Sequence, residues 1–174
     1  MKEINILIII FGITILLLLL LVFFVNNLLL KKRRVDLQFE SIIIYLKDRV
    51  ELLNRIANII ENTTTNEIKL LDDIDKTSTI LNEIKISTKE GLKEIKKSTK
   101  LFEKYTKLAE IYPTLNDNKI YSMLIDEIEL NESRLEYAIE SYDKEAKKYN
   151  ELKQTKINSI VSKVFNLKDY ELFK

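Results

Sequence analysis

The side chains of this chain that could do chemistry are carboxylates, lysines and hydroxyls, because its 174 residues include no His and no Cys. Carboxylates can hold hard cations, and two groups stand close together in the sequence. They are Glu129 with Glu132, and Asp72, Asp73 and Asp75. Di-iron helical bundles also need Glu-x-x-His motifs. Charged residues are rarely buried, so we interpret both groups as solvated helix faces and expect no metal and no cofactor.

Other classes of active site lack their essential residues. Without His there is no imidazole base, and without Cys there is no thiolate nucleophile or Cys-ligated zinc. Gly12 and Gly91 are the only two glycines, too few for a phosphate-binding loop. A Ser–Lys pair is compatible with the composition, but no Ser is distinguished by its neighbours. We therefore expect a protein that has no catalytic residues and is not an enzyme.

An apolar segment dominates the N-terminus. Between Ile6 and Val25, 18 of 20 residues are Val, Ile, Leu or Phe, and 20 helical residues span about 30 Å, the thickness of a bilayer core. A cleaved signal peptide is the alternative, but its apolar run would be shorter and a small-residue cleavage site would follow. We expect a short flank at 1–5 and a transmembrane anchor at 6–30.

Four cations follow the apolar segment directly, namely Lys31, Lys32, Arg33 and Arg34. Positive charge stays on the cytoplasmic side of a membrane. This basic juxtamembrane segment, 31–34, therefore predicts a single-pass protein of the inner membrane, with a short N-terminus outside and the C-terminal domain in the cytoplasm. The same four side chains are candidate contacts for anionic lipid headgroups. Their simpler role is to stop translocation.

Residues 35–155 show the periodicity of a helical bundle. An apolar stripe runs from Val35 to Ile60, and two capping-box patterns, Thr64 with Glu67 and Ser87 with Glu90, mark helix starts. One continuous helix over 66–111 is also allowed. Pro113 ends the third helix, and Asn116, Asp117 and Asn118 offer N-caps for the fourth. The predicted fold is all-α, with an antiparallel up-and-down four-helix bundle after the anchor.

The third and fourth helices carry the clearest patterns. The third is predicted to face inward with Leu92, Ile95, Phe102, Tyr105, Leu108 and Ala109. The fourth has a near-heptad seam: Tyr121, Leu124, Ile128, Asn131, Leu135, Ala138, Tyr142, Ala146 and Tyr149. Asn131 either lies in the core, where it would fix the register, or faces solvent. Because 89–107 is basic and 126–145 is acidic, the two helices are expected to be neighbours.

The C-terminal tail, 156–174, alternates apolar residues with lysines. Its apolar residues are Ile157, Ile160, Val161, Val164, Phe165, Leu167, Tyr170 and Phe173. A basic amphipathic segment can lie in a membrane interface. The alternative, which we prefer slightly, is that these groups cap the open end of the bundle.

Several short motifs stand in the second half of the chain: Leu108–Leu115 (LAEIYPTL), Asn131–Ala138 (NESRLEYA), the pairs Tyr142-Asp143 and Tyr149-Asn150, and Val164–Lys168 with Tyr170 and Phe173. In these motifs the chain resembles the LemA family of bacterial membrane-anchored proteins. The chain departs from the family at Glu51–Arg55, which lacks a Pro, at Asn166, where Gly is usual, and at Asp169, where Pro is usual. The resemblance implies a four-helix bundle on one span and implies no catalytic residues.

Three functional hypotheses follow. The first is a structural or interaction module, tethered to membrane lipids by its anchor, that binds an unknown protein partner or itself. The second is a membrane-surface module working through Lys31–Arg34 and the tail. The third is a membrane-anchored coiled-coil oligomer. Nucleic acid is not expected as a partner, because the net charge is only +1 and the lysines are not interleaved with a platform of aromatic residues on which bases could stack.

Overall fold

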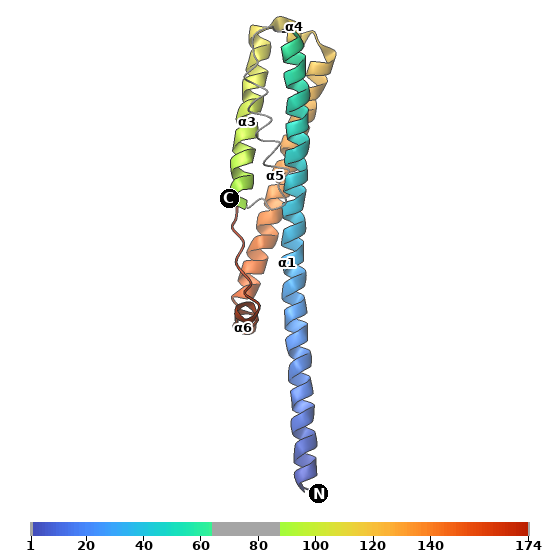
Figure 1. The fold of residues 1–174 in the computed structure, drawn as a ribbon, viewed down its shortest axis with the longest axis vertical. Helices are drawn as coiled ribbons and strands as arrows, with labels where there is room; N and C mark the ends of the chain where they lie inside the picture. Colours follow the sequence, from blue (N-terminus) through green and yellow to red (C-terminus); the bar gives the residue numbers. More distant parts are fainter. Residues whose placement is uncertain (1, 64–87, 174) are drawn as a thin grey trace. The chain divides into compact units, whose positions relative to one another are not determined.

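The computed structural model describes residues 2–63 and 88–173 (Figure 1). Within these residues it is built from helices, in the order α1 (Lys2–Thr63), α3 (Thr88–Ile111), α4 (Pro113–Asn116), α5 (Lys119–Lys153) and α6 (Lys156–Val164). The predicted second helix and its Thr64–Glu67 cap lie outside the described residues, as does Ser87. The chain divides into two compact units, and each is described by itself below.

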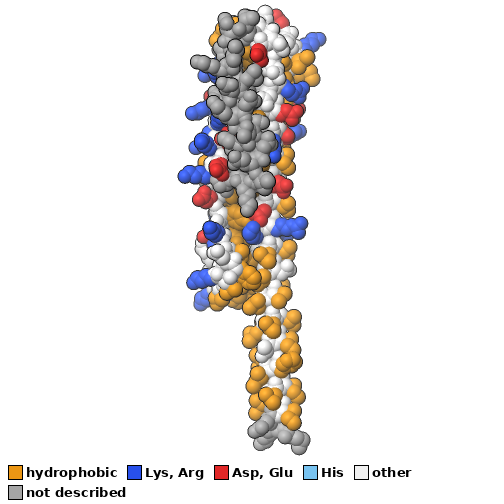
Figure 2. All heavy atoms as spheres, in the orientation of Figure 1, with side chains coloured by type: hydrophobic (Ala, Val, Ile, Leu, Met, Phe, Trp, Pro, Cys, Tyr) orange, Lys and Arg blue, Asp and Glu red, His pale blue; other side chains and the backbone are white. Residues whose placement is uncertain are grey.

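Helix α1 continues without a break from the apolar segment into the predicted first bundle helix, as the lack of Gly and Pro in 26–62 allows. Side chains from Ile4 to Phe23 are exposed, and Figure 2 shows apolar side chains along this end of the chain. The first buried residue among those described in α1 is Leu28. By length and composition this part of α1 could cross a membrane. The predicted inward stripe also contained Phe39, which is half-buried. The rest of the stripe is confirmed, since the following residues are buried: Val35, Ile42, Leu46, Val50, Leu53, Ile56 and Ile60.

Unit 2 comprises Gln38–Asp143 and Glu171–Lys174. In it α1 contacts α5 at two levels: Phe39 lies 5.7 Å from Tyr142 between ring centroids, and Arg49 bonds to Asn131 and Glu132. Because the higher-numbered residue of α1 contacts the lower-numbered residue of α5, the two helices run in opposite directions here. Helix α3 contacts α5 through the Tyr121 hydroxyl, which donates to the Tyr105 carbonyl at 2.9 Å.

The ends of α3 and α5 follow the sequence signals. Helix α3 stops at Ile111, two residues before Pro113, which occupies the first turn of α4. Asn118 caps α5, because its Oδ1 accepts from the backbone N–H groups of Ile120 at 3.0 Å and Tyr121 at 3.3 Å. Every residue of the predicted α5 seam is buried, from Tyr121 to Tyr149.

The inward face of α3 agrees with the predicted one at Tyr105 and differs from it at the other described positions. The buried residues are Gly91, Glu94, Ser98, Leu101 and Tyr105, whereas Leu92, Ile95 and Phe102 are half-buried. The side chains of 108–110 lie outside the described set. The helix is rotated toward its polar row because Ser98 and its neighbour Thr99 bond to a buried cation on α1.

Unit 1 comprises Met1–Leu37 and Lys144–Tyr170. It contains the N-terminal part of α1, the end of α5, all of α6 and most of the tail. Helix α6 ends in a Schellman motif, in which the Leu167 N–H donates to the Ser162 carbonyl at 2.8 Å and Asn166 N–H to that of Lys163 at 3.3 Å. Asn166 has a positive φ of 49°, a left-handed conformation that Gly adopts most readily.

Candidate interaction surfaces

Arg49 of α1 is fully buried and forms the centre of a polar network in unit 2. Its Nε donates to Asn131 Oδ1 at 3.4 Å, and its Nη1 donates to the hydroxyls of Ser98 at 3.3 Å and Thr99 at 3.1 Å. Its Nη2 forms an ion pair with the Glu132 carboxylate. The network therefore joins α1 to both α3 and α5.

Asn131 is buried, since only 5% of its surface is exposed. Besides accepting from Arg49, its Nδ2 donates to the Tyr45 carbonyl at 3.0 Å. Of the two positions expected for Asn131, the core position is the one in the structure. Burial lowers the pKa of Arg49, and the neighbouring Glu132 opposes that shift by its charge and its hydrogen bond. The guanidinium nevertheless remains a cation, as arginine does throughout proteins.

Sequence analysis did not identify Arg49, although a signal was present. Arg49 follows Leu46 by three residues and precedes Leu53 by four, and both leucines are fully buried. This spacing places position 49 on the inward stripe of α1. A single cation on such a stripe requires partners from the helices packed against it.

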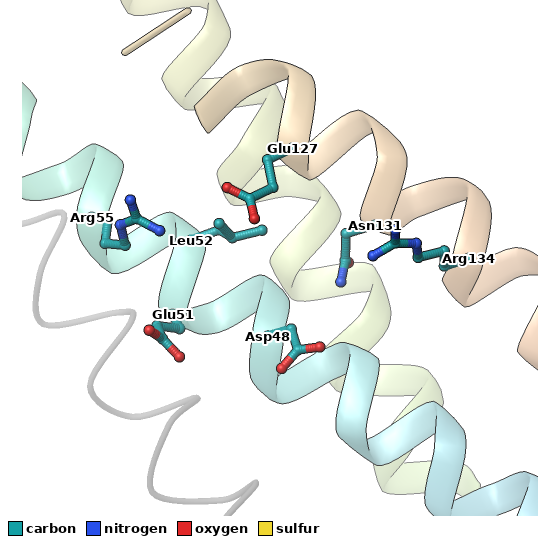
Figure 3. A pocket seen from close by; sticks show the side chains of 7 residues that line it. All are labelled: Asp48, Glu51, Leu52, Arg55, Glu127, Asn131 and Arg134. Carbon is teal, nitrogen blue, oxygen red and sulfur yellow. The ribbon is translucent and has the colours of Figure 1, made fainter. Parts of the chain in front are cut away.

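A polar pocket of about 160 Å³ opens between α1 and α5 in unit 2 (Figure 3). Its lining residues are Asp48, Glu51, Leu52 and Arg55 of α1 and Glu127, Asn131 and Arg134 of α5. Its lining includes three carboxylates and two guanidinium groups, and no nucleophile stands beside a base. Its chemistry suits a group that can pair with both signs of charge. Among the described residues no group of three or more carboxylates could hold a metal ion. Glu129 is exposed and Glu132 pairs with Arg49, and Asp72, Asp73 and Asp75 lie outside the described residues.

An apolar stripe borders this pocket on α5. We call it the α5 outer stripe, and it consists of Ile120, Met123, Leu130 and Tyr137. Its members are from 50% to 74% exposed, and the last three are seven residues apart. Glu127 and Arg134, which line the pocket, lie between them along the helix. The stripe therefore has the heptad spacing of a helix-pairing surface, with one acid and one base within it.

The basic segment 31–34 in unit 1 is only partly turned to solvent. The Lys32 ammonium pairs with Asp36 at 2.8 Å and lies 6.0 Å from the centroid of the Tyr170 ring. Lys31 is half-buried, and Arg33 and Arg34 are exposed. A hydrogen bond from Lys148 lowers the pKa of Glu145, and the charges of Lys31 and Arg34 lower it further. Headgroup binding by these four residues stays a prediction.

Side chains of α5 hold the tail by its backbone. In unit 1 the Asn150 amide makes two bonds to Tyr170: its Nδ2 donates to the Tyr170 carbonyl at 2.9 Å, and its Oδ1 accepts from the Tyr170 N–H at 3.0 Å. In unit 2 the Tyr142 hydroxyl donates to the Glu171 carbonyl at 2.9 Å, and Asp143 accepts from the Phe173 N–H at 2.8 Å. These bonds fix the last residues of the tail against α5.

The capping alternative describes one part of the tail, and the other part is exposed. Tyr170 packs on Tyr149, with ring centroids 5.2 Å apart, and Phe173 packs on Tyr142, at 5.3 Å. These aromatic groups cover bundle residues, as the capping alternative predicts. By contrast, Ile157, Ile160, Val164 and Phe165 are exposed by 50% to 74%.

Comparison with known families gives one match, the LemA family model, over residues 38–174. The chain belongs to the LemA family. The matched region starts within α1, after the apolar segment. A comparison with curated proteins gives no match.

The residues that carry the LemA resemblance make intramolecular contacts in this chain. Asn131 and Glu132 bind Arg49, whereas Tyr142-Asp143 and Tyr149-Asn150 hold the tail. In this LemA-family chain the motif residues therefore fix helices and tail in place. Among the described residues, the exposed apolar side chains include those of the α5 outer stripe and of one face of α6.

Proposed function

We propose that this LemA-family chain is a membrane-tethered helical bundle that acts as a structural, non-enzymatic protein-interaction module. The apolar part of α1 would serve as an uncleaved anchor in the inner membrane, because its side chains are exposed and carry no charge from Ile4 to Phe23. The bundle would be the antiparallel four-helix bundle expected from the sequence. The contacts between α1 and α5, which run in opposite directions in unit 2, support this arrangement.

The proposed orientation puts the bundle in the cytoplasm, since the cations at 31–34 follow the anchor. Ser133 on α5 is exposed and the chain has no Cys, so Ser133→Cys introduces a single accessible thiol. A membrane-impermeant maleimide should label it only after the cells are lysed. Labelling in intact cells would reverse the orientation and direct the search for partners to the envelope.

The observation that carries the interaction function is the α5 outer stripe. Exposed large apolar side chains cost stability in water when they stay uncovered, and contiguous ones mark interaction sites. Leu130 is 50% and Tyr137 is 74% exposed, and Glu127 and Arg134 alternate with the apolar members. We expect the occupant to be an amphipathic helix of a protein partner, whose charges pair with Glu127 and Arg134.

Site-specific photocrosslinking in native membranes tests this function. A photoreactive residue at Leu130 should give a discrete adduct, whereas one at Glu129, which is exposed but lies outside the stripe, should give none. The Leu130 adduct should disappear when Met123 and Tyr137 are both replaced by Asp. An adduct of twice the chain's mass would identify a second copy as the partner. Equal, diffuse labelling at Leu130 and Glu129 would refute the interaction surface.

A further inference from the structure

Helix α6 buries polar residues and exposes apolar ones, the reverse of what is usual for a helix on the surface of a water-soluble protein. Its polar residues Asn158 and Ser162 are buried, at 3% and 7% exposure, whereas Ile157, Ile160 and Val164 are 51%, 67% and 74% exposed. The three apolar residues recur at intervals of three and four, so they share one face. Phe165, at the end of the helix, is 50% exposed.

Local hydrogen bonds fix this orientation. Asn158 Nδ2 donates to the carbonyl of Leu152, in the last turn of α5, at 3.0 Å and to the hydroxyl of Thr155, the residue before α6, at 2.9 Å. The Ser162 hydroxyl is satisfied within α6, because it donates to the Ser159 carbonyl at 2.9 Å. Rotating α6 to bury its isoleucines would expose Val161 and break the bonds of Asn158. The outward direction of the apolar face is therefore part of the fold of unit 1.

The charge around this face has one sign. Residues 156–168 contain three lysines, Lys156, Lys163 and Lys168, and no Asp or Glu. Apolar side chains on one face with lysines beside them form the pattern of helices that lie in a membrane interface. A helix of nine residues is much too short to cross a bilayer.

Unit 1 places this face in the same compact body as the end of the apolar segment. The Tyr170 hydroxyl donates to the Asp36 carboxylate, and Lys32 lies against the Tyr170 ring. The Asn150 amide holds the Tyr170 backbone at the same time. The tail that follows α6 is thus tied to α1 within a few residues of the point where the apolar run ends at Leu30.

We propose that α6 is an interfacial helix, which lies in the headgroup layer of the bilayer that α1 crosses. Ile157, Ile160, Val164 and Phe165 would enter the acyl boundary, and the three lysines would contact anionic phosphate groups. The proposal rests on the proposed membrane anchor and goes beyond protein interaction, because it assigns this face to phospholipid. Position favours lipid over a protein helix: the face belongs to the unit that carries the anchor, and it is cationic.

Depth measurement on the full chain tests the proposal. An environment-sensitive fluorophore is attached at Ile160→Cys in one sample and at Ile120→Cys in the control, since these isoleucines are 67% and 60% exposed and the chain has no other thiol. Both are reconstituted in phosphatidylcholine vesicles with and without phosphatidylglycerol. Nitroxide attached to the lipid chains should quench the label at 160 strongly and leave the label at 120 unchanged. A label at Val164→Cys, 74% exposed, should repeat the result of position 160.

The lysines provide the second arm. Replacing Lys156, Lys163 and Lys168 by Gln should remove the part of the quenching at 160 that depends on phosphatidylglycerol, because each lysine near an anionic surface strengthens binding about fivefold. If the chain floats with the vesicles but labels at 160 and 164 are quenched no more than at 120, the interfacial helix is refuted while the anchor stands. If the chain does not float with vesicles, both proposals fail.

Discussion

Replacement of Arg49 gives the sharpest test of how the bundle is held together. Arg49→Ala removes a fully buried side chain that bonds to two other helices. Ser98 keeps its bond to the Ile95 carbonyl, and Glu132, whose side chain is 45% exposed, can be solvated by water. The unpaired group that remains buried is Asn131 Oδ1, and such a group costs about 1–3 kcal/mol.

The cavity adds to this cost. Truncating a long buried side chain to Ala costs about 2–5 kcal/mol, so Arg49→Ala should lower the free energy of unfolding by at least about 3 kcal/mol. The double variant Arg49→Met with Asn131→Leu should behave differently. It fills the volume and removes the orphaned acceptor together with the desolvated cation. Replacing buried charged groups by apolar ones of similar size is often neutral or stabilising by about 1–4 kcal/mol.

The pKa of Arg49 gives the reason for this asymmetry. Burial lowers it more than Glu132 raises it, so the folded protein disfavours the charged form relative to the unfolded chain. For a cation that stays charged at neutral pH, this means that burial of the charge costs net stability there. In the double variant the Tyr45 carbonyl loses the hydrogen bond that Asn131 donates to it. This carbonyl lies inside α1, where main-chain carbonyls accept hydrogen bonds of the helix itself, so it does not become an unpaired group.

Urea titration of the full chain in detergent, followed by far-ultraviolet circular dichroism, measures these differences. Arg55→Ala is the control, because Arg55 is an exposed arginine of the same helix, and it should change stability by no more than about 0.5 kcal/mol. A double variant as unstable as Arg49→Ala would refute the reasoning, since the polar network would then contribute net stability.

Three further outcomes are expected in the same titration. Gly91→Ala should stabilise the bundle by about 0.5–1 kcal/mol, because an added Cβ would lie at 3.7 Å from Phe173, an ordinary contact, within a helix; a loss of stability would show that the site is tighter than these distances. Asn166 has a positive φ, so Asn166→Gly should be neutral or stabilising and Asn166→Ala should cost about 1 kcal/mol; equal effects would contradict the left-handed conformation. Burial and the charges of Asp169 and Asp36 raise the pKa of Tyr149. The stability that depends on its protonated hydroxyl is therefore complete below about pH 10 and is lost as the pH rises further. Tyr149→Phe should reduce the fall in stability between about pH 9 and about pH 11, and an unchanged fall would assign it to other groups.

Periodicity alone predicts the parts of the fold that obey a simple apolar stripe. All nine residues of the α5 seam are buried, and α1 buries most of its predicted line. The capping residue Asn118 and the stop before Pro113 were also readable, because each depends on local backbone geometry. Such signals act within a few residues, and no knowledge of the neighbouring helices is needed to use them.

Features that depend on partners from other helices could not be predicted in this way. The inward row of α3 contains Glu94 and Ser98, where the apolar pattern favours Leu92 and Ile95. Ser98 is drawn inward by Arg49, a contact between residues 49 positions apart. For α6 the alternation of apolar residues and lysines indicates an amphipathic segment, but it does not indicate which face is packed.

The buried polar residues of α5 and α6 select which apolar face each helix directs outward. Helix α5 carries two apolar lines, the buried seam and the α5 outer stripe, and a helix with two such lines could pack by either one. Asn131 lies on the seam beside the stripe and bonds to Arg49 and Tyr45, and these bonds form in one rotation of α5 only. A buried polar group can thus select one packing at a cost in stability. In α6 the inward Asn158 selects the rotation in the same way. Both polar residues keep an apolar face directed outward, which benefits the protein only where a partner helix or a membrane covers that face.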